Sequence, residues 1–129
     1  MMKRSTYVLI AAIIIAVFGL GFLISPNTVL SIYGSKLDTT GEFVARYFGS
    51  ALIGLAVTWF MARGAKTIED THKGGYLGGL VLGVTGLLVA IWDVFAGTHN
   101  SFVWANVAIY AFFAIGFAYC YFKKRVVGV

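Results

Sequence analysis

Two oppositely charged residues, Arg46 and Asp93, lie inside long apolar stretches of this 129-residue chain. A charge at membrane depth costs roughly 2.5–3.5 kcal/mol on insertion scales, so such a charge usually has a partner or a function. The guanidinium of an arginine carries five donors and matches the geometry of a carboxylate. The sequence therefore predicts that Arg46 and Asp93 pair across two neighbouring helices.

Three further polar residues are expected close to this pair. Asn106 should lie at a similar depth on another helix, and Tyr110 follows it by one helical turn on the same face. Glu42 precedes Arg46 by four residues, which places it in reach of the same charge. Two interpretations remain open: an outward-opening binding pocket, or an ion pair that only holds helices together. The second is favoured, because a charge one turn inside a membrane can also snorkel to water.

No metal site, cofactor site or catalytic motif is expected. The single cysteine, Cys120, excludes an intramolecular disulfide and a CxxC redox pair. His72 and His99 fall in loops on opposite sides of the predicted membrane, so they cannot bind one metal ion together. The zinc-protease, nucleophile-elbow and phosphate-loop motifs do not occur. The chain is predicted to be non-enzymatic, and its net charge of +5 requires no nucleic-acid partner.

The composition indicates which elements hold these residues. Hydrophobic residues make up 60% of the chain and charged residues 12%, with a mean hydropathy of +0.88. Soluble domains average about 45–50% apolar and about 25% charged, and a chain of this size cannot bury the excess. Four apolar runs approach the roughly 20 residues needed to cross a bilayer. They predict a single all-α domain over residues 1–129, an integral membrane four-helix bundle with spans at about 7–24, 43–62, 76–95 and 102–122.

Basic residues gather on one side of the predicted spans. Eight of the ten lie at the N-terminus, in the loop between the second and third spans, or in the C-terminal tail. They are Lys3, Arg4, Arg63, Lys66, Lys73, Lys123, Lys124 and Arg125. The positive-inside rule then predicts a multi-pass protein of the plasma (inner) membrane with both termini in the cytoplasm.

The loop after the first span is expected to contain a short helix of its own. Ser25 and Pro26 form a helix-start signal, and Gly34 supplies a helix stop. Apolar residues between these signals predict a short helix that lies in the outer membrane interface. A re-entry turn that simply packs on the helix ends and a lid or recognition role are equally good interpretations of this segment.

Small residues predict where helices approach closely. Gly75, Gly79 and Gly83 recur at four-residue spacing in the third run, and Gly49 lies in the second. Small residues at this spacing allow helix backbones to come into contact in membranes. Contact inside one bundle is favoured over contact with a second copy or with a partner protein.

Residues 26–63 contain three recognisable motifs: P-N-T-V-L-S-I-Y-G, A-R-Y-F-G-S-A-L-I-G-L-A and W-F-M-A-R. With these motifs the chain resembles the DoxX-like small four-helix membrane proteins, many of which have no known function. The A-R-Y-F-G segment is also similar to four-helix scaffold proteins of sterol synthesis. The resemblance implies that Arg46 lies near one membrane face. Some DoxX-like members are linked to quinone-coupled oxidation, but no catalytic residue matches here.

The leading functional hypothesis is a membrane protein that binds a lipid-like small molecule or assembles with another membrane protein. The alternatives are a small transporter or channel protomer that uses Arg46 and Asp93, and an accessory subunit of a quinone-linked oxidoreductase. A transporter needs polar groups near mid-membrane, whereas the predicted cluster is confined to one end. The expected partners are membrane lipid and either a second copy or another membrane protein.

Overall fold

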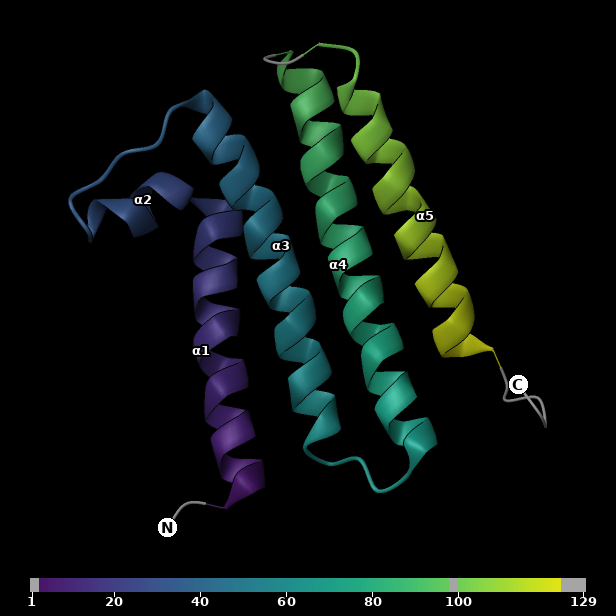
Figure 1. The fold of residues 1–129 in the computed structure, drawn as a ribbon. Helices are drawn as coiled ribbons and strands as arrows, with labels where there is room; N and C mark the ends of the chain where they lie inside the picture. Colours follow the sequence, from purple (N-terminus) through teal and green to yellow (C-terminus); the bar gives the residue numbers. More distant parts are fainter. Residues whose placement is uncertain (1–2, 98–99, 124–129) are drawn as a thin grey trace.

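The computed structural model describes residues 3–97 and 100–123, and within them helices joined by short turns and loops are the regular structure, with no strand (Figure 1). Four long helices carry most of the residues, and each is long and apolar enough to cross a membrane. A fifth, short helix follows the first. The helices are α1 (Arg4–Ile24), α2 (Pro26–Ser31), α3 (Thr39–Ala62), α4 (Ile68–Ala96) and α5 (Val103–Phe122).

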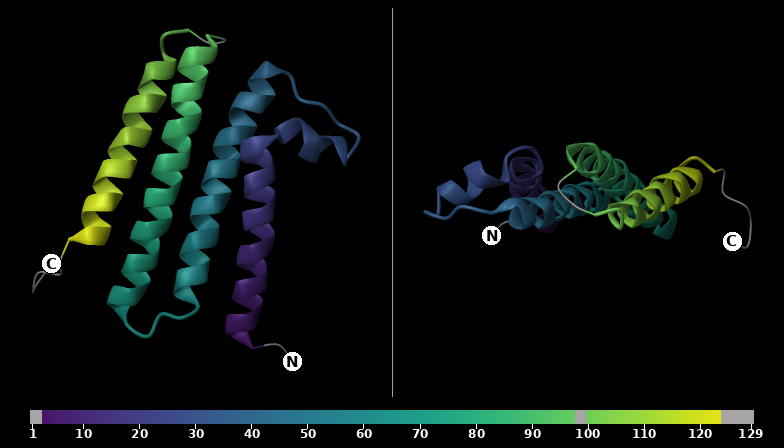
Figure 2. Two further views of the ribbon diagram at one scale, coloured as in Figure 1. Left: turned by 180° about the vertical axis from the view of Figure 1, so that it is seen from behind. Right: turned by 90° about the horizontal axis from the view of Figure 1, so that it is seen from above.

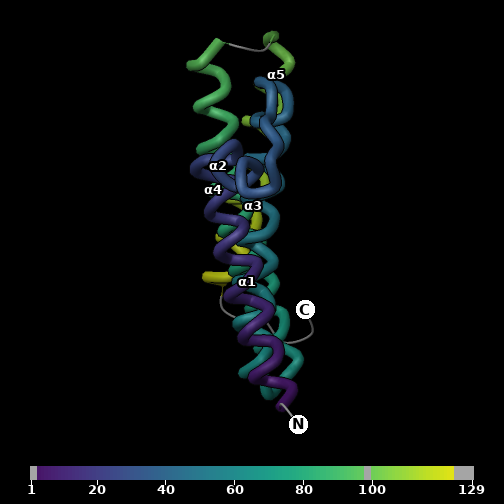
Figure 3. The backbone as a smooth tube through the Cα atoms, turned by 90° about the vertical axis from the view of Figure 1, so that its left-hand side faces the viewer, coloured from purple at the N-terminus to yellow at the C-terminus, as the bar shows by residue number. Residues whose placement is uncertain are grey.

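The long helices run up and down in a single row. Helix α1 packs on α3, α3 on α4, and α4 on α5. Among the described residues, α1 has no close backbone contact with α4, and α3 has none with α5. The views from above and from the side show a thin layer (Figures 2 and 3). The bundle is therefore open, and both faces of the layer are available to other molecules.

The short helix α2 begins where the sequence predicts it. Pro26 occupies the first turn, where its missing N–H costs nothing, and it is buried. The hydroxyl of Ser25 contacts the hydroxyl of Thr28 at 2.6 Å instead of capping the backbone. Helix α2 ends at Ser31, and the following turn reaches Gly34, whose φ of +76° suits glycine.

Helices α3 and α4 begin before the apolar runs that predict them, because polar caps start them. The Asp38 carboxylate accepts a hydrogen bond from the Gly41 N–H at 2.7 Å, so α3 begins at Thr39. The Thr67 hydroxyl accepts from the Asp70 N–H at 3.1 Å, so α4 begins at Ile68. Caps of this kind satisfy donors that the first turn leaves unpaired. Helix α4 consequently continues beyond the predicted span on the side of the α3–α4 turn.

Glycines set the distances between helices. A Cβ placed at Gly49 would lie 2.6 Å from the Gly19 carbonyl oxygen of α1. A Cβ at Gly83 would lie 2.5 Å from the backbone nitrogen of Ala114 in α5, and Gly79 lies against the Phe117 ring. Gly75 differs from these glycines, because no group of the described chain lies within 4 Å of such a Cβ, so it makes no close helix contact within that part of the chain.

The glycines of helix α4 that face α3 are Gly74 and Gly78, each one residue before Gly75 and Gly79. Gly74 lies against Met61, and Gly78 lies against the Gly54 carbonyl and the Thr58 side chain. Helix α4 is packed on two sides, by α3 and by α5. Successive residues point about 100° apart, so a four-residue series drifts slowly around the helix. Of the three glycines in this series, Gly79 and Gly83 therefore contact α5, and Gly75 does not.

The exposed surface of the chain is large, and many large apolar side chains lie on it. The structure exposes 8621 Å², whereas a compact soluble monomer of 13.9 kDa exposes roughly 6,700 Å². Large side chains such as Phe112, Ile115 and Leu88 are among the exposed ones. A thin layer with apolar residues outward suits a lipid solvent, in which helices are held by close packing and interhelical hydrogen bonds.

Candidate functional site

The polar residues predicted to form one cluster are divided between two places. Arg46 forms an ion pair with Glu42, one turn earlier on α3, at 4.0 Å. Asp93 instead accepts a hydrogen bond from the Tyr47 hydroxyl at 3.4 Å. The predicted pairing of Arg46 with Asp93 is therefore corrected: within the described residues, each has a different partner.

The cause of this division is the direction of neighbouring side chains on α3. Consecutive residues of a helix point about 100° apart. Arg46 lines a depression between α1 and α4, whereas Tyr47 reaches Asp93 on α4 and Asn106 on α5. Helix α3 thus directs Arg46 to the depression between α1 and α4, and Tyr47 toward polar residues of α4 and α5.

The first place is a polar cluster that joins α3, α4 and α5. The Asn106 amide donates to the Tyr47 hydroxyl at 3.3 Å, and that hydroxyl donates to Asp93. The Tyr47 and Tyr110 rings stack with centroids 5.2 Å apart and planes inclined by 14°. Asp93 is buried, at 5% exposure. Because α3 and α5 lack close backbone contact in the described chain, these side chains connect them across α4.

Tyr47 is the member of this cluster that sequence reasoning missed. It follows Arg46 directly in the A-R-Y-F-G motif, and its hydroxyl is a second polar group in that motif. The cluster unites three predicted residues, Asp93, Asn106 and Tyr110, around that tyrosine. Its arrangement suits a structural connection, since the rings and hydrogen bonds are directed at each other.

A second interhelical tie lies deeper along α3 and α4. Ser50 is fully buried, and its hydroxyl donates to the Leu82 carbonyl at 3.0 Å and contacts the Thr85 hydroxyl at 2.6 Å. Thr85 in turn donates to the Val81 carbonyl at 2.8 Å. Hydrogen bonds between membrane helices are worth about 0.6 kcal/mol on average. This tie fixes the α3–α4 pair, and Thr85 also lines the depression described next.

The second place is the depression that Arg46 lines. Its volume is about 350 Å³, within the 300–1,000 Å³ that ligand pockets commonly occupy. Helices α1, α3 and α4 all contribute to the wall. The lining residues are Leu23, Ile24, Arg46, Thr85, Leu88, Val89 and Trp92. One guanidinium beside an apolar wall is an arrangement suited to an amphiphile with an anionic group.

Asn27 connects this place to α2, and sequence reasoning missed it too. Its side-chain amide donates to the Glu42 carboxylate, and its side-chain oxygen accepts from the Leu37 N–H at 2.6 Å. Glu42 therefore lies between Asn27 and Arg46. The signal was present as a single amide residue directly after Pro26 in the apolar α2 segment. The contact fixes the α2 loop against the first turn of α3.

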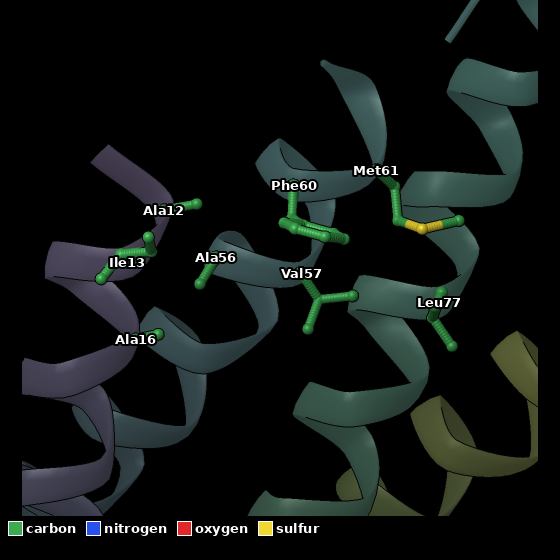
Figure 4. Close-up of a pocket in the computed structure, with 8 residues that line it drawn as sticks. All are labelled: Ala12, Ile13, Ala16, Ala56, Val57, Phe60, Met61 and Leu77. Carbon is green, nitrogen blue, oxygen red and sulfur yellow. The ribbon is translucent and has the colours of Figure 1, made fainter. Parts of the chain in front are cut away.

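A further depression, of about 400 Å³, lies on the same face toward the other end of α3 (Figure 4). Figure 4 shows Ala12 and Ala16 of α1 facing α3, with Ala56, Val57 and Phe60 on the α3 side. The residues that line it are all apolar. Small side chains on α1 and α3 leave this space open.

These features define an all-helical protein with four helices suited to a membrane, a polar interhelical cluster and two depressions on one face. Residues 9–128 match the family described as "Domain of unknown function (DUF8292)", and the chain belongs to that family. A search of curated proteins and a search of solved structures each gave no match. The family match contains no link to DoxX-like proteins.

Within the described residues, no three histidine, cysteine or acidic side chains are grouped as a metal site.

Proposed function

We propose that this chain is a non-enzymatic integral membrane protein that binds an amphiphile with an anionic head group at Arg46. The observation that carries the proposal is the position of Arg46 at an apolar depression between α1 and α4. The anionic group binds the guanidinium, and the apolar part lies against Leu88 and Trp92. A membrane lipid or a lipid-like small molecule has this chemistry.

The ion pair of Arg46 leaves capacity for a ligand. Its separation of 4.0 Å from Glu42 exceeds the roughly 2.7–2.9 Å of a strong charge-assisted hydrogen bond. A guanidinium has five donors, so one distant carboxylate cannot satisfy it. Glu42 is also engaged by Asn27. An anion that approaches through the depression therefore competes with a weak internal contact.

The test measures retention of a defined lipid by the purified protein. Protein in a neutral detergent receives phosphatidylglycerol or phosphatidylcholine at equal concentration, and native mass spectrometry counts the bound lipid. Arg46→Gln should lower phosphatidylglycerol binding roughly five-fold, the effect of losing one cation near a lipid head group. Lys36→Gln is the matched control, because Lys36 is exposed in the α2–α3 loop and lines no part of this depression. Equal loss in both variants would contradict the proposal.

The membrane placement is part of the same proposal. We place the protein in the plasma (inner) membrane with both termini cytoplasmic and α2 in the outer interface, on the basis of the basic-residue distribution. The helix ends at residues 4, 62, 68 and 122 lie together at one end of the layer, as this topology requires (Figure 1). The proposed relationship to DoxX-like proteins rests on the motifs within residues 26–63.

Cysteine labelling in a Cys120→Ser background tests the orientation. A membrane-impermeant maleimide added to intact cells should label a cysteine at position 35 and should not label one at position 66. The opposite pattern would reverse the topology while leaving the lipid site intact.

A further inference from the structure

A polar depression adjoins the apolar one at the α3–α4 turn. It has a volume of about 380 Å³ and shares Phe60 and Met61 with its apolar neighbour. Arg63, Asp70 and Lys73 supply its charged lining. The two depressions therefore adjoin at the end of α3. The first has an apolar lining, and the second has a charged one.

The charged lining favours an anion. Arg63 and Lys73 contribute two positive charges against the single negative charge of Asp70. The Asp70 carboxylate already accepts a hydrogen bond from the Lys66 backbone N–H at 3.2 Å. An anion in this depression thus meets an excess of positive charge.

Arg63 is positioned at the border between the two spaces. Its guanidinium carbon lies 4.6 Å from the centroid of the Phe60 ring, and Phe60 lines both depressions. A cation above an aromatic face is attracted by the ring, which favours this placement of the side chain. The polar and apolar walls are therefore joined in the order in which a phospholipid presents its phosphate and its acyl chain.

We propose that this end of the protein binds an anionic phospholipid, distinct from the amphiphile at Arg46. The lipid phosphate lies between Arg63 and Lys73, and one acyl chain lies in the apolar depression along Ala56 and Val57. The combination of excess positive charge with an adjoining apolar space of about 400 Å³ carries the proposal. It does not depend on the Arg46 site, which different residues line.

The head-group arm of the test uses the full chain in a neutral detergent with phosphatidylglycerol or phosphatidylcholine as the probe. Each cation near an anionic lipid surface contributes roughly a five-fold change in binding, so Arg63→Gln with Lys73→Gln should weaken phosphatidylglycerol binding about 25-fold. Lys66→Gln is the matched control, since Lys66 is an exposed cation of the same turn that does not line the depression. Equal weakening by Lys66→Gln would overturn the proposal.

The acyl-chain arm separates a lipid from a soluble anion. Ala16→Phe should fill the apolar depression and weaken phosphatidylglycerol binding, whereas Val17→Phe, at a position that is 64% exposed on the same helix, should leave binding unchanged. Glycerol 3-phosphate, which lacks the chains, should not displace the lipid at equal concentration. Displacement by glycerol 3-phosphate together with no effect of Ala16→Phe would show a soluble-anion site instead. Both arms are run in the Arg46→Gln background, which weakens binding at the other site, so the remaining phosphatidylglycerol reports on this end of the protein and the two proposals fail separately.

Discussion

Replacing Gly83 by alanine tests how helices α4 and α5 are held together. The added Cβ would lie 2.5 Å from the backbone nitrogen and 2.8 Å from the Cα of Ala114. Ordinary van der Waals contact begins at 3.4 Å. The obstacle is backbone, so no rotamer change relieves it, and the two helices must separate locally by about 1 Å with loss of dispersion contacts around the site.

The magnitude follows from a comparison within the same helix. Overpacking of a close contact costs about 1–3 kcal/mol. A glycine-to-alanine change inside a helix gains up to about 1 kcal/mol from backbone propensity. Gly75→Ala receives the same gain with no steric cost, because no other group lies within 4 Å of the new Cβ. Gly83→Ala should therefore be less stable than Gly75→Ala by about 1–3 kcal/mol, and the propensity contribution cancels in the difference.

Reversible unfolding in mixed micelles of dodecyl maltoside and sodium dodecyl sulfate measures both free energies of unfolding, with far-ultraviolet circular dichroism as the signal. Size-exclusion chromatography should show the same oligomeric state for the two variants. Equal stability of Gly75→Ala and Gly83→Ala would refute the close α4–α5 contact. Greater loss in Gly75→Ala would indicate that this glycine meets a second copy of the chain.

Three further predictions use the same unfolding measurement. Tyr47→Phe should destabilise the protein by about 1 kcal/mol, because it removes the hydroxyl bonded to Asp93 while keeping the ring stack; Tyr110→Phe, which also keeps its ring, should cost less. Arg46→Gln and Asp93→Asn should be additive within about 0.5 kcal/mol, and a larger coupling would restore the ion pair predicted from the sequence. Asn27→Ala should destabilise by about 1 kcal/mol and increase proteolysis of the α2–α3 loop, because two hydrogen bonds hold that loop; unchanged proteolysis would contradict this role.

The sequence predicts the helices better than it predicts where they begin. Hydropathy marks the segments that suit lipid, and it places the far end of the second run at residue 62, where α3 ends at Ala62. The start of α4 at Ile68 lies well before the apolar run that begins at residue 76, because the Thr67 cap and two acidic residues favour helix at its first turn. The hydropathy of a residue and the conformation of its backbone are separate properties. The capping residues Asp38 and Thr67, and not hydropathy, indicate where the backbones of α3 and α4 become helical.

The polar cluster shows that the depth of a residue in the membrane does not predict which residue its side chain contacts. Counting residues along each span gave Arg46, Asp93 and Asn106 similar heights, because the rise of a helix is fixed at about 1.5 Å per residue. Height does not give direction, and one residue on a helix changes the direction by about 100°. Tyr47, not Arg46, therefore meets Asp93, and the guanidinium is left beside an apolar wall. The direction depends on which faces of α3 pack against α1 and α4, and the close approach of Gly49 to Gly19 and of Gly54 to Gly78 determines it. A correct assignment of these glycine contacts would have separated the structural cluster from the candidate binding site.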